Sequence, residues 1–293
     1  MSLDSSPPSI PQAAGPAARA LGPVRTIRSA LFFLSFLLQA VFIVGLGQRL
    51  IIYPAIALAP RRRHDIMARW FRFNAAITMA LARRVGKLRV AVRGALPLES
   101  CVVVMNHQSV FDIPAAVWLV RGPQIVIPTR DRYRKGIPGI SPLGRLGGFP
   151  FLAQGRRASR EELLALQRSA DDVARGDTTL VIFPEGHRTR DGSLGRFMRS
   201  GLRLVLQRAR RPVYYVVADG LWHARTAADV LHTFAHSELR LAVHGPLAPP
   251  DDESVDAFID ALHERMAAAL AELRAGDSSA EPAADAERAV AGR

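Results

Sequence analysis

From Lys87 onward, short apolar runs rich in β-branched residues alternate with longer stretches whose apolar residues recur every three or four positions. The runs are typical of buried strands, and the stretches are typical of helices. Strand–helix alternation predicts the α/β class, with one domain built on a largely parallel central sheet flanked by helices. The strands are expected at residues 88–92, 101–105, 124–127, 149–152, 179–183, 212–218 and 239–244.

The helices of this domain are expected at residues 113–120, 158–175, 196–210 and 254–275. Ser159 and Glu162 form a capping box at the start of the second helix, which is a typical helix N-terminus. These elements place the α/β domain at residues 87–275. The low-complexity residues 276–293 and the Pro-, Ala- and Ser-rich residues 1–23 are expected to be disordered tails.

Residues 24–86 are predicted to be a helical membrane anchor. The run 30–46 is apolar on all sides and would be about 26 Å long as a helix, whereas the run 50–59 is shorter and contains Pro54. A signal peptide, a single span, a buried core helix and a hairpin or dip in one leaflet are the alternatives. The hairpin or dip is favoured because it accommodates basic residues on both sides of the apolar runs. These basic residues are Arg25 and Arg28 before them and Arg61, Arg62 and Arg63 after them.

Residues 64–85 continue as an amphipathic helix, either packed on the sheet or lying on the membrane surface. Its apolar face is expected to hold Ile66, Trp70, Phe73, Ile77 and Leu81.

The net charge of +13 over 293 residues indicates an anionic partner, which leaves nucleic acid, anionic lipid and phosphorylated substrates as candidates. Nucleic acid is the weakest of these, because only 7% of residues are aromatic and no basic stretch is interleaved with aromatic residues. The single cysteine, Cys101, excludes an internal disulfide and fits a cytosolic environment. The sequence also lacks a zinc-ligand cluster, so no metal is expected.

A histidine and an aspartate follow the expected strand at residues 101–105. His107 comes directly after the strand end, and Asp112 follows five positions later, near the start of the next helix. A turn from loop to helix can fold the carboxylate back onto the imidazole. The pairing would fix the histidine tautomer and stabilise its protonated form, as general-base catalysis requires. The alternative is a structural histidine beside a capping aspartate.

A second polar loop follows the expected strand at residues 179–183. It contains Glu185, Gly186 and the arginines Arg188 and Arg190. Open α/β sheets bind ligands at such strand ends, and guanidinium groups match phosphate oxygens. The loop therefore predicts an anion site, although a solvated turn with a local Glu–Arg pair would also explain it.

Together, Asn106-His107-x4-Asp112 and Phe183-Pro184-Glu185-Gly186-x-Arg188 resemble the glycerolipid acyltransferases, above all the 1-acylglycerol-3-phosphate (lysophosphatidate) acyltransferase family. The resemblance covers roughly residues 88–246. It implies transfer of an acyl group from acyl-CoA or acyl-acyl-carrier protein to lysophosphatidate, giving phosphatidate. His107 would be the general base, Asp112 would orient it, and Glu185, Gly186 and Arg188 would hold the acceptor. No cofactor is implied.

The family's second motif matches less cleanly, because Gln154 stands where a phosphate-binding arginine is expected, and Arg156 or Arg157 would substitute for it. His187 likewise replaces a threonine. These differences leave open another lysophospholipid or an amino-acid-derived lyso-lipid as the acceptor. A hydrolase is disfavoured because no Gly-x-Ser-x-Gly motif is present, and a non-enzymatic basic lipid-binding protein remains a further alternative. The expected location is a membrane, at the cytoplasmic face of a bacterial inner membrane, in contact with its lipids.

Overall fold

The computed structural model describes residues 22–137, 139–153 and 159–275. The tail expected at residues 276–293 lies outside the described residues. So does the tail at residues 1–23, except for Gly22 and Pro23, where the first helix begins. Gln154, Arg156 and Arg157 also lie outside them.

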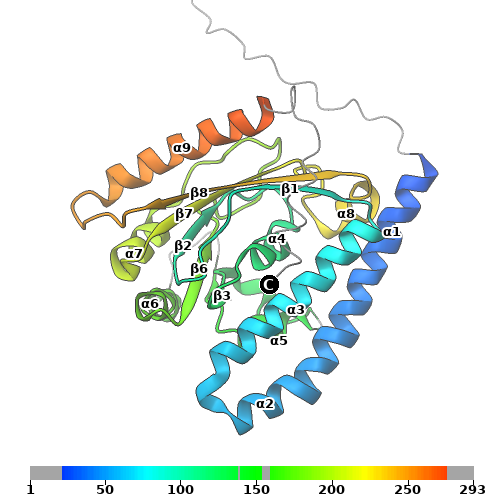
Figure 1. Cartoon of the computed structure of the whole chain (residues 1–293), viewed down its shortest axis with the longest axis horizontal. Helices are drawn as coiled ribbons and strands as arrows, with labels where there is room; N and C mark the ends of the chain where they lie inside the picture. Colours follow the sequence, from blue (N-terminus) through cyan, green and yellow to red (C-terminus); the bar gives the residue numbers. More distant parts are fainter. Residues whose placement is uncertain (1–21, 138, 154–158, 276–293) are drawn as a thin grey trace, which may run out of the picture.

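A six-stranded sheet forms the centre of the molecule (Figure 1). Every pair of neighbouring strands is parallel except β7 and β8, so the predicted largely parallel sheet is confirmed. In spatial order the strands are β1 (Arg89–Arg93), β8 (Glu238–Leu247), β7 (Val213–Asp219), β2 (Val102–Met105), β6 (Thr178–Ile182) and β3 (Gln124–Val126).

Both faces of the sheet are covered by helices, and successive side chains of a strand point to opposite faces, so one strand contributes to two cores. On β2, Val103 and Met105 join one core, which includes residues of α3 (Arg63–Arg84) and α4 (Asp112–Leu119). Val102 and Val104 join the other core, which includes residues of three helices. These are α6 (Arg160–Arg175), α7 (Arg199–Ala209) and α9 (Val255–Ala275).

Several short elements were not predicted or were assigned to the wrong sheet. The strand expected at residues 149–152 forms as β5 (Phe151–Leu152), but it pairs with β4 (Thr129–Arg130) in a separate two-stranded sheet. The helices α5 (Ile140–Leu146) and α8 (Ala227–Thr233) were missed. Both have only seven residues, so neither displays a full helical period twice, and α5 also contains a proline and a glycine.

The predicted helices of the domain are otherwise confirmed, with small shifts at their ends. The capping box of Ser159 and Glu162 is present, whereas α7 begins at Arg199 rather than at residue 196. The expected buried face of α3 is confirmed in part, because Trp70 is buried and Ile66 and Leu81 pack against the core. Phe73 is instead 51% exposed, and Met67, Phe71 and Met79 are buried although they were not expected to be. Apolar residues occupy adjacent positions along this helix, so periodicity alone could not fix which side faces the core.

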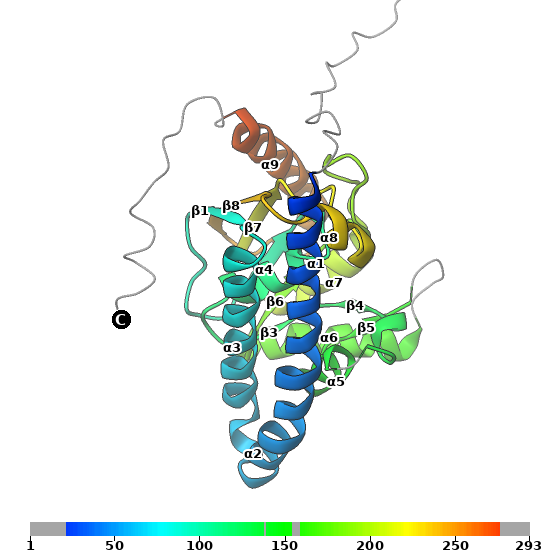
Figure 2. The ribbon, with the colours of Figure 1, turned by 90° about the vertical axis from the view of Figure 1, so that its right-hand side faces the viewer.

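The apolar N-terminal segment is one continuous helical run, Pro23–Leu58, rather than two separate pieces. It consists of α1 (Pro23–Leu38), the π-helical η1 (Gln39–Leu46) and η2 (Gln48–Ile52), and α2 (Tyr53–Leu58). Pro54 is the second residue of α2, where the π-helical η2 passes into the α-helix, and the run continues through it although proline lacks a backbone N–H. The chain then reverses through η3 (Pro60–Arg62), and α3 runs back beside α1 (Figure 2).

This run is long and apolar enough to cross a membrane, and only 22% of its most apolar window is buried. A buried core helix, one of the alternatives for this segment, would show a much larger buried share. Many large apolar side chains are instead exposed along the run, and they include Val24, Ile27, Leu31, Leu34, Phe42, Leu50, Ile51 and Leu58.

The buried side of α1 packs on the α/β domain close to the strand-end loop after β2. Phe32 stacks on Phe234 with ring centroids 4.2 Å apart, and Phe234 in turn lies 5.0 Å from Phe111. Arg25 donates hydrogen bonds to the carbonyls of Thr233 and Ala235. The apolar N-terminal helix and the residue before Asp112 therefore share one aromatic cluster.

Candidate functional site

Asn106 fixes the point where the loop leaves β2. Its Nδ2 donates to the Ala218 carbonyl at 2.9 Å, and its Oδ1 accepts from the Ala218 N–H at 2.7 Å. The amide thus reproduces a backbone pair and extends the contact between β2 and β7 by one step beyond the strand. This role in the backbone turn agrees with a side chain that is almost completely buried.

One carboxylate oxygen organises the loop that follows. Asp112 Oδ2 accepts hydrogen bonds from the backbone N–H groups of Gln108 at 2.6 Å and Ser109 at 2.7 Å. His107 Nδ1 lies 2.9 Å from the same oxygen. Asp112 is 1% exposed and begins α4, where the partial positive charge of the helix N-terminus favours an anion. The predicted fold-back of Asp112 onto His107 is therefore present.

The His107 ring is oriented from two sides. Asp112 engages Nδ1, and the ring stacks on Phe183 with centroids 4.4 Å apart. The side chain is 14% exposed. With Nδ1 engaged, Nε2 is the ring nitrogen left to meet a ligand, and no described residue forms a hydrogen bond with it. The arrangement holds one imidazole nitrogen ready to accept a proton.

The second polar loop, which follows β6, is joined to the first by two hydrogen bonds. The carboxylate of Glu185 accepts one of them and also accepts a hydrogen bond from within its own loop. Glu185 Oε1 accepts from the His107 N–H at 2.8 Å, and Glu185 Oε2 accepts from the Gly195 N–H at 2.8 Å. The Thr189 N–H donates to the His107 carbonyl at 2.9 Å. Glu185 was expected to contact the substrate or an arginine, but both of its oxygens bond to backbone groups and it is 1% exposed.

Burial has a marked effect on this bridging carboxylate. It raises the pKa of Glu185 to about 7, and the nearby Asp112 charge acts in the same direction. The two N–H donors from His107 and Gly195 oppose the shift, because they stabilise the ionised form. Glu185 therefore carries a proton more readily than an ordinary carboxylate does.

The segment from Gly186 to Arg188 lies beside an arginine that sequence reasoning missed. Gly186 has a φ of +67°, a left-handed backbone conformation that residues with a side chain rarely adopt, so glycine is favoured there. Arg130 of β4 donates to the Gly186 carbonyl at 3.3 Å. Arg188 is half-buried and donates to the Arg225 carbonyl. The structure therefore brings Arg130 to the predicted anion-binding loop.

Positive charge accumulates where these arginines meet. Burial lowers the pKa of Arg130, and the charges of Arg132 and Arg188 lower it further. The pKa of Tyr133 is also lowered: burial alone would raise it, but the hydrogen bond from Arg132 and the charges of the surrounding arginines outweigh that effect. Such mutual repulsion is relieved when an anion binds between the guanidinium groups.

Like His107, Arg130 lies in a loop that follows a strand of the parallel sheet, so its position could have been predicted from the sequence. It comes four residues after the end of β3, at the same edge of the sheet as the loops after β2 and β6. By contrast, His187 is exposed, and its Nδ1 lies 2.7 Å from the Glu185 carbonyl. Arg190 is also exposed.

No group of three or more His, Cys, Asp or Glu side chains that could hold a metal ion occurs among the described residues. Cys101 is a buried free thiol, and burial raises its pKa to about 12. It is therefore not a nucleophile at neutral pH.

The domain is similar to known acyltransferases in sequence. Residues 88–218, which contain both loops, match the family model described as Acyltransferase. Human 1-acyl-sn-glycerol-3-phosphate acyltransferase alpha is 25% identical over 189 residues, or 64% of this chain and 65% of that protein. The 1-acyl-sn-glycerol-3-phosphate acyltransferase of Pseudomonas aeruginosa is 27% identical over 189 residues, or 64% of this chain and 68% of that protein.

The fold is shared with a solved structure. The crystal structure of the 1-acyl-sn-glycerophosphate acyltransferase PlsC from Thermotoga maritima aligns with a TM-score of 0.67 and 24% identity, covering 86% of this chain and 98% of that one. The match to the human relative spans slightly less than two thirds of its length. Residues 88–218 carry the match to the Acyltransferase family model, which confirms the resemblance drawn from the two loops. The solved structure shows that the fold is shared.

The raised pKa of Glu185 predicts a pH-dependent stability. Between its ordinary value near 4.5 and about 7, the unfolded chain has lost this proton while the folded chain retains it. The contribution of the Glu185 proton to the stability of the fold is thus complete below about pH 4.5 and is lost as the pH rises to about 7. We expect the free energy of unfolding of the unmodified chain, measured in urea relative to Glu185→Gln, to fall across this interval and then level off. A difference independent of pH would contradict the assignment.

Proposed function

We propose that this protein transfers a fatty acyl group from an acyl thioester to the free hydroxyl of 1-acyl-glycerol-3-phosphate, producing phosphatidate. The observation that carries the proposal is the juxtaposition of an oriented imidazole with an arginine-rich anion site. His107 is held by Asp112, and Arg130 and Arg188 flank the adjoining loop. We take the acceptor from the names of the relatives, 1-acyl-sn-glycerol-3-phosphate acyltransferases. Such an acceptor carries a hydroxyl for the imidazole and a phosphate for the anion site.

The reaction needs one proton relay. Nε2 of His107 removes the proton from the acceptor hydroxyl, and the resulting oxygen attacks the thioester carbonyl carbon. The C–S bond then breaks, and the imidazolium returns the proton to the departing thiolate. Asp112 stabilises the imidazolium through Nδ1 at 2.9 Å while its own charge is held by two backbone N–H groups. The donor is acyl-CoA or acyl-acyl-carrier protein.

The acceptor itself supplies the nucleophile in this proposal. Ser109 is the nearest serine in sequence to His107, but its hydroxyl is fully buried and donates to the Ala224 carbonyl at 2.6 Å. Cys101 is buried with a raised pKa. Neither side chain is available to form an acyl-enzyme, which disfavours the serine hydrolase alternative.

The phosphate of the acceptor would lie against Arg130 and Arg188. Their guanidinium groups are partly desolvated, so each phosphate contact is stronger than on an open surface. Gly186 would permit close approach of the phosphate to the backbone. Glu185 would act indirectly, because it ties the His107 loop to the anion-binding loop.

The N-terminal helices, within residues 24–86, would hold the site at a lipid surface. The exposed apolar side chains of the Pro23–Leu58 run provide a membrane-binding face, and Arg61, Arg62 and Arg63 follow at the turn. A helix pair that lies in one leaflet satisfies both features. We place the enzyme at the cytoplasmic face of a bacterial inner membrane, where both thioester donors are found.

The activity is tested with purified protein, acyl-CoA and lysophosphatidate, with phosphatidate measured by mass spectrometry. We expect His107→Ala to lower kcat by about 10²–10⁴, because a positioned general base contributes that much to the rate. Asp112→Asn should also lower kcat. The control is His232→Ala, which alters an exposed histidine of α8 and should leave the rate unchanged.

Two results would overturn the proposal. Turnover that survives His107→Ala at the unmodified rate excludes the base. Turnover on another lysophospholipid or amino-acid-derived lyso-lipid, with none on lysophosphatidate, replaces the acceptor while keeping the chemistry.

Arg130→Ala tests the anion site. A charged hydrogen bond contributes about 1.5–3 kcal/mol, so we expect the KM for lysophosphatidate to rise roughly tenfold to a hundredfold. The preference over monoacylglycerol, which lacks the phosphate, should shrink by the same factor. Arg208→Ala removes an exposed arginine paired with Asp171 and serves as the control. An unchanged preference in Arg130→Ala would show that the phosphate binds elsewhere.

A further inference from the structure

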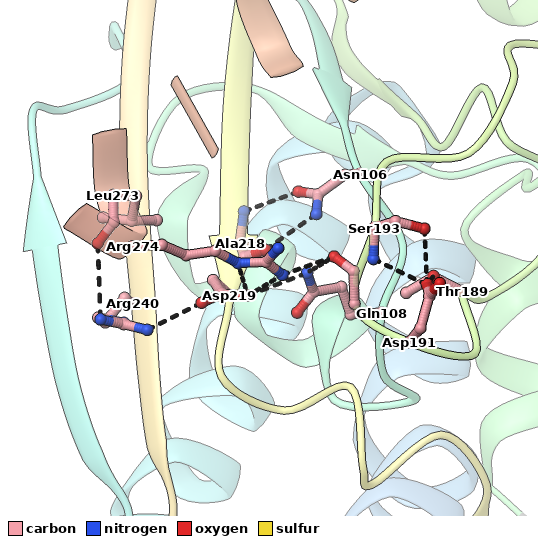
Figure 3. Close-up of polar contacts among 11 residues, drawn as sticks. Asn106, Gln108, Thr189, Asp191, Ser193, Ala218, Asp219, Arg240, Leu273 and Arg274 are labelled. Carbon is pink, nitrogen blue, oxygen red and sulfur yellow. Dashed lines mark hydrogen bonds and ion pairs between the residues drawn. The ribbon is translucent and has the colours of Figure 1, made fainter. Parts of the chain in front are cut away.

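Asp219 is a buried acid outside the catalytic pair and the anion-binding loop. It ends β7 and is 4% exposed. Its Oδ2 accepts from Arg240 Nη2 of β8 at 2.8 Å, and its Oδ1 accepts from Arg274 Nη2 of α9 at 2.8 Å (Figure 3). Gln108 Nε2 also donates to Oδ1, at 3.2 Å. One carboxylate thus joins two strands, the last helix and the His107 loop.

Two arginines face the single carboxylate of Asp219 and favour its ionised form. Burial alone would raise the pKa of Asp219, but the hydrogen bond and charge of Arg274, the Gln108 bond and the Arg240 charge outweigh burial and lower it. An ionised carboxylate at this depth binds its donors more strongly than a neutral group would.

Gln108 connects this cluster to the reacting groups. Its backbone N–H donates to Asp112 Oδ2 at 2.6 Å, the oxygen that also faces His107 Nδ1. Its side-chain Nε2 donates to Asp219 and, at 2.9 Å, to the Gly192 carbonyl. Gln108 is thus the residue through which Asp219 is linked to Asp112.

Arg274 reaches the second loop directly. Its Nη2 donates to the Gly192 carbonyl at 2.7 Å, so Arg274 and Gln108 share both Asp219 and Gly192 as acceptors. Gly192 has a φ of +83°, and a Cβ there would lie 2.8 Å from Arg274 Nη2. The backbone is thus shaped to let the arginine approach.

We propose that Asp219 and Arg274 are positioning residues, which set the geometry of the His107–Asp112 pair through Gln108 and hold the second loop through Gly192. This inference rests on the proposed acyltransferase function. Helix α9 is then part of the catalytic apparatus, although Asp219, Arg240 and Arg274 all follow the segment that matches the acyltransferase family, residues 88–218.

Another ion pair on α9 does not involve the catalytic loops and can serve for comparison. Arg203 of α7 pairs with Asp256 of α9, and both side chains are about half exposed. That pair joins two helices, and within the described part of the chain neither side chain forms a hydrogen bond or ion pair with the loops after β2 and β6. Arg274 is comparably exposed, at 40%, on the same helix as Asp256. Replacing Arg203 or Arg274 by alanine therefore removes a side chain of the same size and similar exposure.

We expect Arg274→Ala to lower kcat about tenfold while the KM values for the acceptor and donor stay nearly constant, because the change alters alignment and leaves binding intact. Arg274→Lys keeps the charge but not the fork that reaches both Asp219 and Gly192, so it should recover part of the loss. Arg203→Ala is the matched control and should keep full kcat. Equal kcat in Arg274→Ala and Arg203→Ala would overturn the proposal.

A double-mutant cycle tests the route through Gln108. If Arg274 acts through Gln108, the combined variant Gln108→Ala/Arg274→Ala should lose less rate than the product of the single losses. Gln108→Ala combined with Arg203→Ala should lose no more than Gln108→Ala alone. Independent, multiplicative losses for Gln108 and Arg274 would exclude the shared route.

Hydrogen exchange gives a readout that needs no substrate. The backbone N–H groups of Gln108, Ser109 and Thr189 should exchange faster in Arg274→Ala than in Arg203→Ala, because these groups and their acceptors lie in the segments that Arg274 holds. Unchanged exchange would contradict the positioning role whatever the activity. Faster exchange in a chain whose unmodified form shows no acyl transfer would contradict the proposed function and leave the positioning network intact.

Discussion

The site depends on the crowding of three hydrogen-bond donors around one oxygen, Asp112 Oδ2. Two of the donors are successive backbone N–H groups and the third is the His107 ring, so the imidazole and the backbone of its loop are fixed together. The other carboxylate oxygen, Oδ1, has no partner among the described residues. The negative charge of Asp112 is thus directed toward the histidine that would become positively charged during acyl transfer.

Two further buried carboxylates stabilise the surroundings of that oxygen. Glu185 ties the His107 backbone to Gly195, and Asp219 ties the Gln108 side chain to β8 and α9. Each bonds to protein donors, as the cost of burying a carboxylate requires. Asp219 ends β7, whereas Asp112 and Glu185 lie in the segments that follow β2 and β6. The sheet thus brings together segments that are far apart in the chain.

Features that depend only on residues close together in the sequence were predicted best. The strand-end position of His107, the five-residue spacing to Asp112 and the capping box of Ser159 all depend on neighbouring residues, and each is present in the structure. Arg130 was missed because no motif marks the loop after β3, although that loop follows a predicted strand. The contact between Asp219 and Arg274 crosses 55 residues, so no spacing rule applies to it. Periodicity predicted only part of the buried face of α3, because apolar residues stand at adjacent positions along this helix.

The central claim is that the acceptor hydroxyl attacks the thioester directly, with His107 as its base. It is tested most directly by mixing excess protein with acyl-CoA in a rapid-quench experiment, with and without lysophosphatidate. Direct attack predicts that free thiol appears only when the acceptor is present, at the same rate as the new ester, and that no acyl-protein adduct forms. A burst of thiol without acceptor, together with an acylated serine or cysteine, would contradict it.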